Sequence, residues 1–142
     1  HMFQMRIQKY IQKLTAKTKP KLILVCMIYH PDINPRIESW ANTALGALGY
    51  NRDPGKLQSM IERTFEQATS HIRIPGTRVI PVPLYQVLDG TNSGDYVARV
   101  EPSSEGGRKM AELLLDCIDK AERSILDNTG GTPVTAQYMR ER

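Results

Sequence analysis

Cysteines, long apolar runs and basic clusters are all scarce in this sequence. The 142 residues include two cysteines. Cys26 and Cys117 each lie within an apolar periodic segment, which predicts two buried, small hydrophobic side chains and neither a disulfide nor a metal site. No apolar run approaches the roughly 20 residues of a membrane-spanning helix, so no membrane partner is expected. The net charge is +4, but the lysines and arginines are spread along the chain, which argues against a nucleic-acid partner.

The two ends of the chain differ from its middle. His1 and Met2 resemble the remnant of a cleaved purification tag, and the polar, Gly/Pro-punctuated segment 128–142 is typical of a flexible tail. One domain is therefore expected over residues 3–127. The start lacks the layout of a signal peptide, and unpaired cysteines suit a reducing compartment, so we expect a soluble, cytoplasmic protein.

The spacing of apolar residues predicts four helices and two strands. Each predicted helix has one apolar stripe, and the third opens with Asp53 as cap and Pro54 at its first position. Trp40 and Phe65 lie in these stripes and are expected in the core. The predicted helices cover Phe3–Lys17, Ile37–Leu48, Asp53–Ile72 and Ser104–Leu126, and the predicted strands cover Leu22–Tyr29 and Val79–Leu84.

The order of these elements is typical of an α/β protein. The strand at Leu22–Tyr29 is apolar on both faces, as in the middle of a parallel sheet covered by helices, whereas two prolines in the strand at Val79–Leu84 suggest an edge. We therefore predict a three-layer α/β fold with a mostly parallel sheet. Two strands are too few to cover four helices, since sheets commonly have about four to six strands. The sequence thus predicts the C-terminal part of a larger domain that forms a homo-oligomer.

The histidines are candidates for a binding site. His30 and Tyr29 follow the central strand, where open α/β sheets bind ligands, and with Asp32 and Trp40 they can line a pocket. The alternative is that His30 is an ordinary loop residue before a proline turn. His71 near a helix end suits the helix dipole and needs no further role. No pair of His, Cys, Asp or Glu has metal-ligand spacing, so neither a metal nor a cofactor is predicted.

The segment "DYVARVEPSSEGGRKMAELLLDCI", residues 95–118, contains a polar loop and the start of the last predicted helix. Ser103, Ser104, Gly106 and Gly107 stand where unpaired N–H groups and the helix dipole favour an anion. A serine N-cap followed by Glu105 explains the same residues without a ligand. Each glycine in a first turn costs about 1 kcal/mol relative to alanine, which indicates close approach of a ligand or of a neighbouring element.

The same segment resembles the end of the SGNH (GDSL-like) hydrolase superfamily. In that family the last loop reads roughly D-G-x-H-P-N-x-x-G-x-x-x-(M/L)-A and supplies the acid and base of a Ser-His-Asp triad. Here Pro102, Gly106 and "RKMA" at 108–111 set the register. The register places Ser103 at the family's Asn, Glu101 at its catalytic His and Ala98 at its catalytic Asp. The segment Leu22–Leu84 also fits the second half of that fold.

The resemblance implies a flavodoxin-like, three-layer domain related to serine esterases or acyl hydrolases. Neither a G-D-S nor a G-x-N-D block follows a suitable strand, so the chain alone is expected to be catalytically inactive, with the nucleophile of a parent enzyme elsewhere. The expected ligand is a small ester, acyl or anionic molecule. The alternative is a non-catalytic binding or interaction module. Glu101 is either an altered general base or a loop carboxylate satisfied by backbone N–H groups, Arg99 or Arg108.

Overall fold

The computed structural model describes residues 2–129, with side chains to residue 125. His1 and most of the predicted tail, residues 130–142, lie outside this range. Three short 3-10 turns, η1 (Thr69–His71), η2 (Leu84–Gln86) and η3 (Ser93–Asp95), interrupt the connections. The helices and strands are α1 (Met2–Leu14), β1 (Leu22–Met27), α2 (Asn42–Ala47), α3 (Pro54–Gln67), β2 (Arg78–Pro83), β3 (Tyr96–Val97), β4 (Glu101–Pro102) and α4 (Ser104–Thr129).

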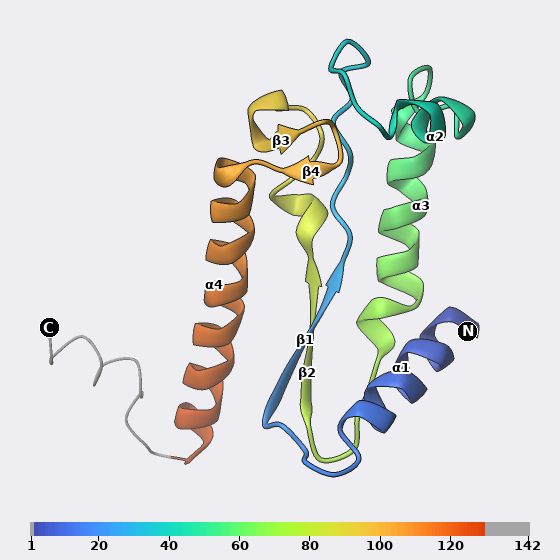
Figure 1. The fold of residues 1–142 in the computed structure, drawn as a ribbon. Helices are drawn as coiled ribbons and strands as arrows, with labels where there is room; N and C mark the ends of the chain where they lie inside the picture. The colour runs from blue at the N-terminus through green and yellow to red at the C-terminus, as the bar shows by residue number, and fades with distance from the viewer. Residues whose placement is uncertain (1, 130–142) are drawn as a thin grey trace, which may run out of the picture.

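The predicted α/β class is confirmed, with a small sheet. β1 and β2 pair in parallel, in a register that runs from Leu22 opposite Arg78 to Met27 opposite Pro83. Figure 1 shows α4 on one side of this pair and α3 with α1 on the other. β3 and β4 form a separate antiparallel pair. Within residues 2–129 the parallel sheet has these two strands alone.

The second helix is shorter than predicted, because local side-chain bonds compete with it. α2 begins at Asn42, not at Ile37. Upstream, the Asn34 side chain accepts the backbone N–H of Arg36, and the Ser39 hydroxyl accepts that of Ala41. Such turns offer the backbone an alternative to helical bonds. Trp40 therefore lies outside the helix with 74% of its surface exposed, and its predicted place in the core is wrong.

The third helix begins as predicted and ends early. Pro54 is its first residue, and Asp53 is the N-cap residue, although its side chain makes no capping bond. α3 ends at Gln67, followed by η1. Phe65 is half-buried and packs edge-on against Tyr85, with ring centroids 5.8 Å apart.

One cluster of the hydrophobic core lies near the loop end of the sheet. Ala41, Leu45 and Tyr50 form it, with Leu57 and Val100 packed against them. Further fully buried side chains lie outside this cluster, among them Val82 on β2 and Ala121 on α4, whereas no residue of α1 is buried. Among the described residues no helix is long and apolar enough to cross a membrane.

The prediction of two buried cysteines is wrong. Cys26 is exposed and Cys117 is half-buried, and both are free thiols. Cys26 is the one exposed residue of β1, whereas the other five residues of the strand are half-buried.

Candidate functional site

The candidate site lies at the carboxyl end of the β1–β2 pair, where two long connections meet (Figure 1). Backbone bonds join them: the His30 N–H donates to the Leu88 carbonyl at 3.0 Å, and the Asp32 N–H donates to the Arg99 carbonyl at 2.8 Å. The Tyr29 hydroxyl donates to the Val100 carbonyl at 2.7 Å. The segments after both strands are therefore held together at the edge where α/β proteins bind ligands.

Glu101 lies on β4 with its side chain exposed. Its carboxylate accepts a hydrogen bond from the indole N–H of Trp40 at 2.8 Å. Neither of the arginines proposed from the sequence bonds to it. Arg99 binds elsewhere, as described below, and Arg108 pairs with two glutamates of α4, Glu105 and Glu112.

Ala98 and Arg99 precede β4 in the left-handed region of backbone space. Their φ values are 51° and 69°, and they are the only non-glycine residues with positive φ within the described chain. This conformation costs of order 1 kcal/mol for each residue with a Cβ, so the surroundings must enforce it. The Ser39 hydroxyl donates to the Ala98 carbonyl, which fixes the first of the two.

The Arg99 side chain fixes the second residue. It is fully buried, and its guanidinium donates twice to the Asp32 carbonyl, at 3.1 and 3.2 Å. It also donates to the side-chain oxygens of Asn42 at 2.9 Å and Asn51 at 3.0 Å. One side chain thus binds three positions that precede it by 67, 57 and 48 residues. A buried charge is tolerated when it is hydrogen-bonded in this way.

Asp32 lies beside Arg99 and is equally buried, with 1% of its surface exposed. Its Oδ1 accepts the backbone N–H of Asn34 at 2.8 Å. Its Oδ2 is buried without a hydrogen-bond partner. Asp32 therefore shapes the loop after β1 and faces the interior, not an open pocket with Trp40.

His30 is buried, with 5% of its surface exposed. Its ring stacks on Tyr85, with centroids 5.2 Å apart, and its Nδ1 lies 3.3 Å from the Asp89 carbonyl. Its Nε2 lies 3.6 Å from a carboxylate oxygen of Glu62 on α3. Burial lowers the pKa of His30, against the opposing effects of the Asp89 carbonyl and Glu62. His30 is thus a loop residue before Pro31, as in the second reading, whose packed ring joins α3 to the loop after β2, and ligand binding by His30 stays a prediction.

The start of α4 has the geometry of a serine cap. The Ser103 hydroxyl accepts the Gly106 N–H at 3.2 Å and donates to the Gly94 carbonyl at 2.7 Å. The Ser103 carbonyl accepts the Gly107 N–H at 2.8 Å. Ser104 is the first helical residue. The donors of both glycines are therefore engaged within the protein, and the binding of an anion here stays a prediction.

The two glycines of this turn have different surroundings. A Cβ added to Gly106 would lie 2.1 Å from the carbonyl oxygen of Asp95, whereas one added to Gly107 would meet nothing within 4 Å. The close approach expected from the sequence is therefore real for Gly106, and a neighbouring loop makes it. The same loop residue anchors the helix, because the buried Asp95 carboxylate accepts the Lys109 ammonium at 2.8 Å.

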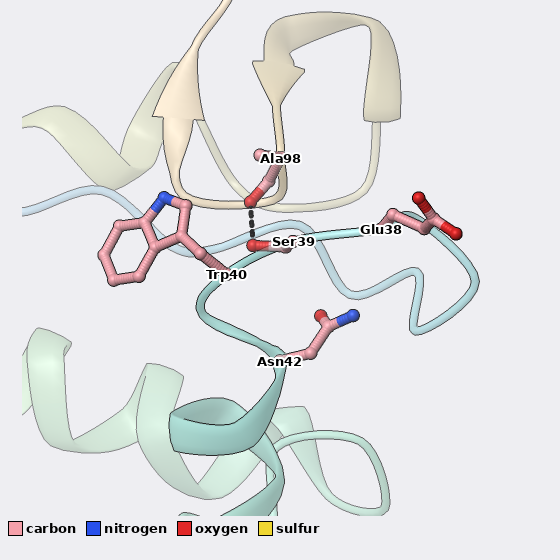
Figure 2. A pocket seen from close by; sticks show the side chains of 5 residues that line it. All are labelled: Glu38, Ser39, Trp40, Asn42 and Ala98. Atoms are coloured by element: carbon pink, nitrogen blue, oxygen red, sulfur yellow. Dashed lines mark hydrogen bonds between the residues drawn. The ribbon is translucent and has the colours of Figure 1, made fainter.

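An open pocket of about 510 Å³ lies beside this loop. Figure 2 shows the Ser39–Ala98 hydrogen bond among the lining residues, with the Trp40 ring on one side of that bond and the Glu38 carboxylate on the other. Asn42 completes the lining. The pocket thus adjoins Ala98, which the resemblance places at a catalytic Asp, and the Trp40–Glu101 hydrogen bond connects the pocket to Glu101.

The sequence did not reveal the parts of this site that depend on long-range contacts. Arg99 was read as a loop cation, and Ser39 and Glu38 were not singled out. One signal was available: Arg99 stands at the glycine of the D-G pair in the family pattern, a position that suits a positive φ. Among the described residues no group of three or more His, Cys, Asp and Glu has a geometry that could hold a metal ion.

Comparisons with protein-family models, with curated proteins and with solved structures find no match to this chain.

Proposed function

We propose that this chain is a non-catalytic, ligand-binding α/β module related to the C-terminal part of SGNH hydrolases, and that it binds its ligand in the pocket beside Ala98. The fold relationship and the binding role have separate support, and each is open to a separate test.

Three backbone features support the relationship. Gly106 matches a glycine of the family pattern, and it has no room for a Cβ. Arg99 stands at a second glycine of the pattern and has a positive φ. Ser103 stands at the pattern's Asn and caps α4, a role for which Ser and Asn are both preferred. At each of these three positions the chain therefore has the local conformation that suits the residue of the family pattern.

The observation that carries the non-catalytic role is the Trp40–Glu101 hydrogen bond. Where the family has its base, a carboxylate accepts an indole N–H at 2.8 Å, and Ala98 replaces the acid. The nearby Ser39 hydroxyl donates to a backbone carbonyl and not to a base. A hydroxyl without a base is a poor nucleophile, so this loop has no means of activating one.

Another serine lies next to a histidine, at the opposite end of β2. Ser70 Oγ and His71 Nδ1 are 3.0 Å apart, but both residues belong to η1 and their contact is exposed. The Ser70 hydroxyl also donates to the Glu66 carbonyl at 2.7 Å. Within residues 2–129 no carboxylate forms an ion pair with the His71 imidazole, so the pair lacks the third member of a triad there.

The lining of the pocket favours a neutral or cationic ligand over an anionic one. Glu38 places an exposed carboxylate in the lining and has no Lys or Arg partner among the described residues. The exposed Trp40 ring offers an apolar face that binds acyl groups, or cations through its π-system. Of the ligand classes expected from the sequence, small neutral esters and acyl compounds suit this pocket best.

The single tryptophan of the chain provides a direct assay. Titration with short-chain acyl esters and with small alkyl amines should change the Trp40 fluorescence and raise the melting temperature. Glu38→Gln should weaken binding of amines by roughly 5- to 10-fold, as expected for loss of one partly solvated charge contact. Glu66→Gln, an exposed glutamate of α3, is the matched control. Unchanged fluorescence with both ligand classes, or equal effects of the two variants on amine binding, would remove the pocket as a binding site.

A second candidate is that the chain belongs to a hydrolase whose nucleophile lies in another segment or subunit. The retained backbone of the last loop supports this reading, since Glu101 keeps the position of the family's base. Its test is ester hydrolysis by a longer natural polypeptide that contains this sequence, compared with its Glu101→Ala variant. A large loss of rate favours the hydrolase, and equal rates eliminate Glu101 from catalysis.

A further inference from the structure

The two outer edges of the β1–β2 pair differ in their hydrogen-bonding groups. The Arg78 N–H donates to the Lys21 carbonyl, which fixes the alternation along both strands. In a parallel pair, every second residue directs both backbone groups to the same neighbour. On β2 the residues directed away from β1 are therefore Val79, Pro81 and Pro83. Two of these three are prolines without an N–H, so this edge is poorly suited to another strand.

The outer edge of β1 has no such protection. By the same alternation its outward residues are Leu22, Leu24 and Cys26, each with an N–H and a carbonyl. No hydrogen bond joins these groups to any other residue in the part of the chain that the structure describes. The edge has no proline, charge or bulge, the features by which proteins usually prevent strand addition.

The side chains at the end of this edge are apolar and accessible. Cys26 is exposed, and Ile28, which follows on the same face, has 57% of its surface exposed. Across the described residues, more large hydrophobic side chains are exposed than buried. A partner that pairs with β1 would cover part of this surface together with the unpaired backbone groups.

We infer that the outer edge of β1 binds β1 of a second copy of this chain, in antiparallel orientation. The outward residues are symmetric about Leu24. A two-fold axis at Leu24 places Leu24 opposite its own copy and Leu22 opposite Cys26 of the copy, and every outward N–H and carbonyl then has a partner. The edge is complementary to itself, which favours a second copy over an unrelated strand. The product is a four-stranded sheet of order β2–β1–β1–β2, within the usual size range.

Sedimentation or light scattering on the whole chain, over a range of concentrations, tests this interface. Leu24→Pro removes an outward N–H without breaking a β1–β2 bond, and Cys26→Lys adds a charge at an exposed position. Both variants should weaken the dimer at least 10-fold. Val79→Pro, at the outer edge of β2, and Cys26→Ser are the matched controls and should leave it unchanged. Circular dichroism checks folding, and Cys26→Lys decides the matter if Leu24→Pro does not fold.

A cross-link tests the register. Leu22→Cys in a Cys117→Ser background places a thiol opposite Cys26 of the copy, at the roughly 5.5 Å Cα separation that a disulfide accepts. Mild oxidation should yield a covalent dimer, whereas Ile23→Cys, on the other face of β1, should not. A monomer at every concentration overturns the proposal. So does a dimer that Leu24→Pro and Cys26→Lys both leave intact, because the interface then lies elsewhere.

Discussion

The loop end of this protein and its helical flanks are organised in opposite ways. At the loop end, the buried Arg99 side chain binds several partners far away in the sequence, and the buried Asp95 carboxylate binds Lys109 at the start of α4. On the flanks, α1 has no buried residue and β1 has an open edge. The difference indicates that contacts within the chain stabilise the loop end, whereas the open edge of β1 is the surface that the proposed dimer would cover. Substitutions at the loop end should therefore lower the free energy of unfolding more than substitutions on the flanks.

Loss of the Arg99 side chain should have the largest effect. Arg99→Ala leaves the buried Asp32 carbonyl and the side-chain oxygens of Asn42 and Asn51 without their donor. We expect a loss of about 3–5 kcal/mol in the free energy of unfolding, measured by urea denaturation. Arg99→Gly should be about 1 kcal/mol less damaging, because glycine adopts the positive φ without strain.

The exposed Arg108 provides the control for this prediction. Its ion pairs with Glu105 and Glu112 are solvated, so Arg108→Ala should change the unfolding free energy far less than Arg99→Ala does. Equal costs at Arg99 and Arg108 would show that the loop end does not depend on the buried guanidinium.

The paired glycines of α4 should respond to alanine with opposite signs. Gly106→Ala forces a Cβ against the Asp95 carbonyl and should cost about 1–3 kcal/mol through displacement of the loop. Gly107→Ala adds a methyl group in open space within a helix and should gain about 0.5–1 kcal/mol. Thermal unfolding of the two variants measures both. A loss of similar size at both positions would contradict the contact at Gly106.

The buried His30 predicts a dependence of stability on pH. Its pKa is lowered in the folded protein, so the unfolded chain binds the proton first as pH falls. The contribution of His30 to the free energy of unfolding should therefore be fully present above the ordinary histidine pKa near 6.5. It should decrease as pH falls below that value, by at most about 1.4 kcal/mol per pH unit for one proton.

The comparison that isolates His30 uses His30→Phe, which keeps the ring stacked on Tyr85. Urea denaturation from pH 8 to pH 5 should show a smaller decrease for the variant than for the natural chain, since the remaining groups titrate in both. Parallel curves would mean that His30 titrates alike in the folded and unfolded states.

Changes on α1 should have the smallest effect. Tyr10 has 61% of its surface exposed and makes no described hydrogen bond. Tyr10→Lys should alter the unfolding free energy by no more than about 0.5 kcal/mol, as is usual for surface substitutions. Urea denaturation at a protein concentration low enough to keep the chain monomeric checks this. A loss above 1 kcal/mol in the free energy of unfolding would show that the contacts of α1 stabilise the chain as those of the loop end do.

Much of the fold was predictable from periodicity. The helices α1, α3 and α4 and the strands β1 and β2 have strong apolar patterns or clear ends, such as Pro54 and Ser103, and the structure confirms them. The stripe at Ile37–Leu48 was misleading, because turns at Asn34 and Ser39 take the backbone groups that a helix needs. Because α2 begins only at Asn42, Trp40 lies upstream of the helix and is exposed instead of buried in the core.

The chemistry of the site was less predictable, because it depends on contacts across long sequence separations. The cap at Ser103 and the close approach at Gly106 are local and were readable. The Trp40–Glu101 bond joins residues 61 positions apart, and the Arg99–Asp32 bonds span 67 positions. Sequence spacing carries no direct signal for such pairs. The resemblance to a hydrolase loop stays a prediction, and the partners of Glu101 and Arg99 come from the structure alone.

The central claim is that the loop carrying Glu101 binds a ligand without hydrolysing it. The most direct test is the rate of p-nitrophenyl acetate hydrolysis by the purified chain and by its Glu101→Ala variant. We predict that neither rate exceeds that of a matched protein control at equal concentration. Clear turnover by the natural chain that Glu101→Ala abolishes would contradict the claim and make Glu101 a catalytic base.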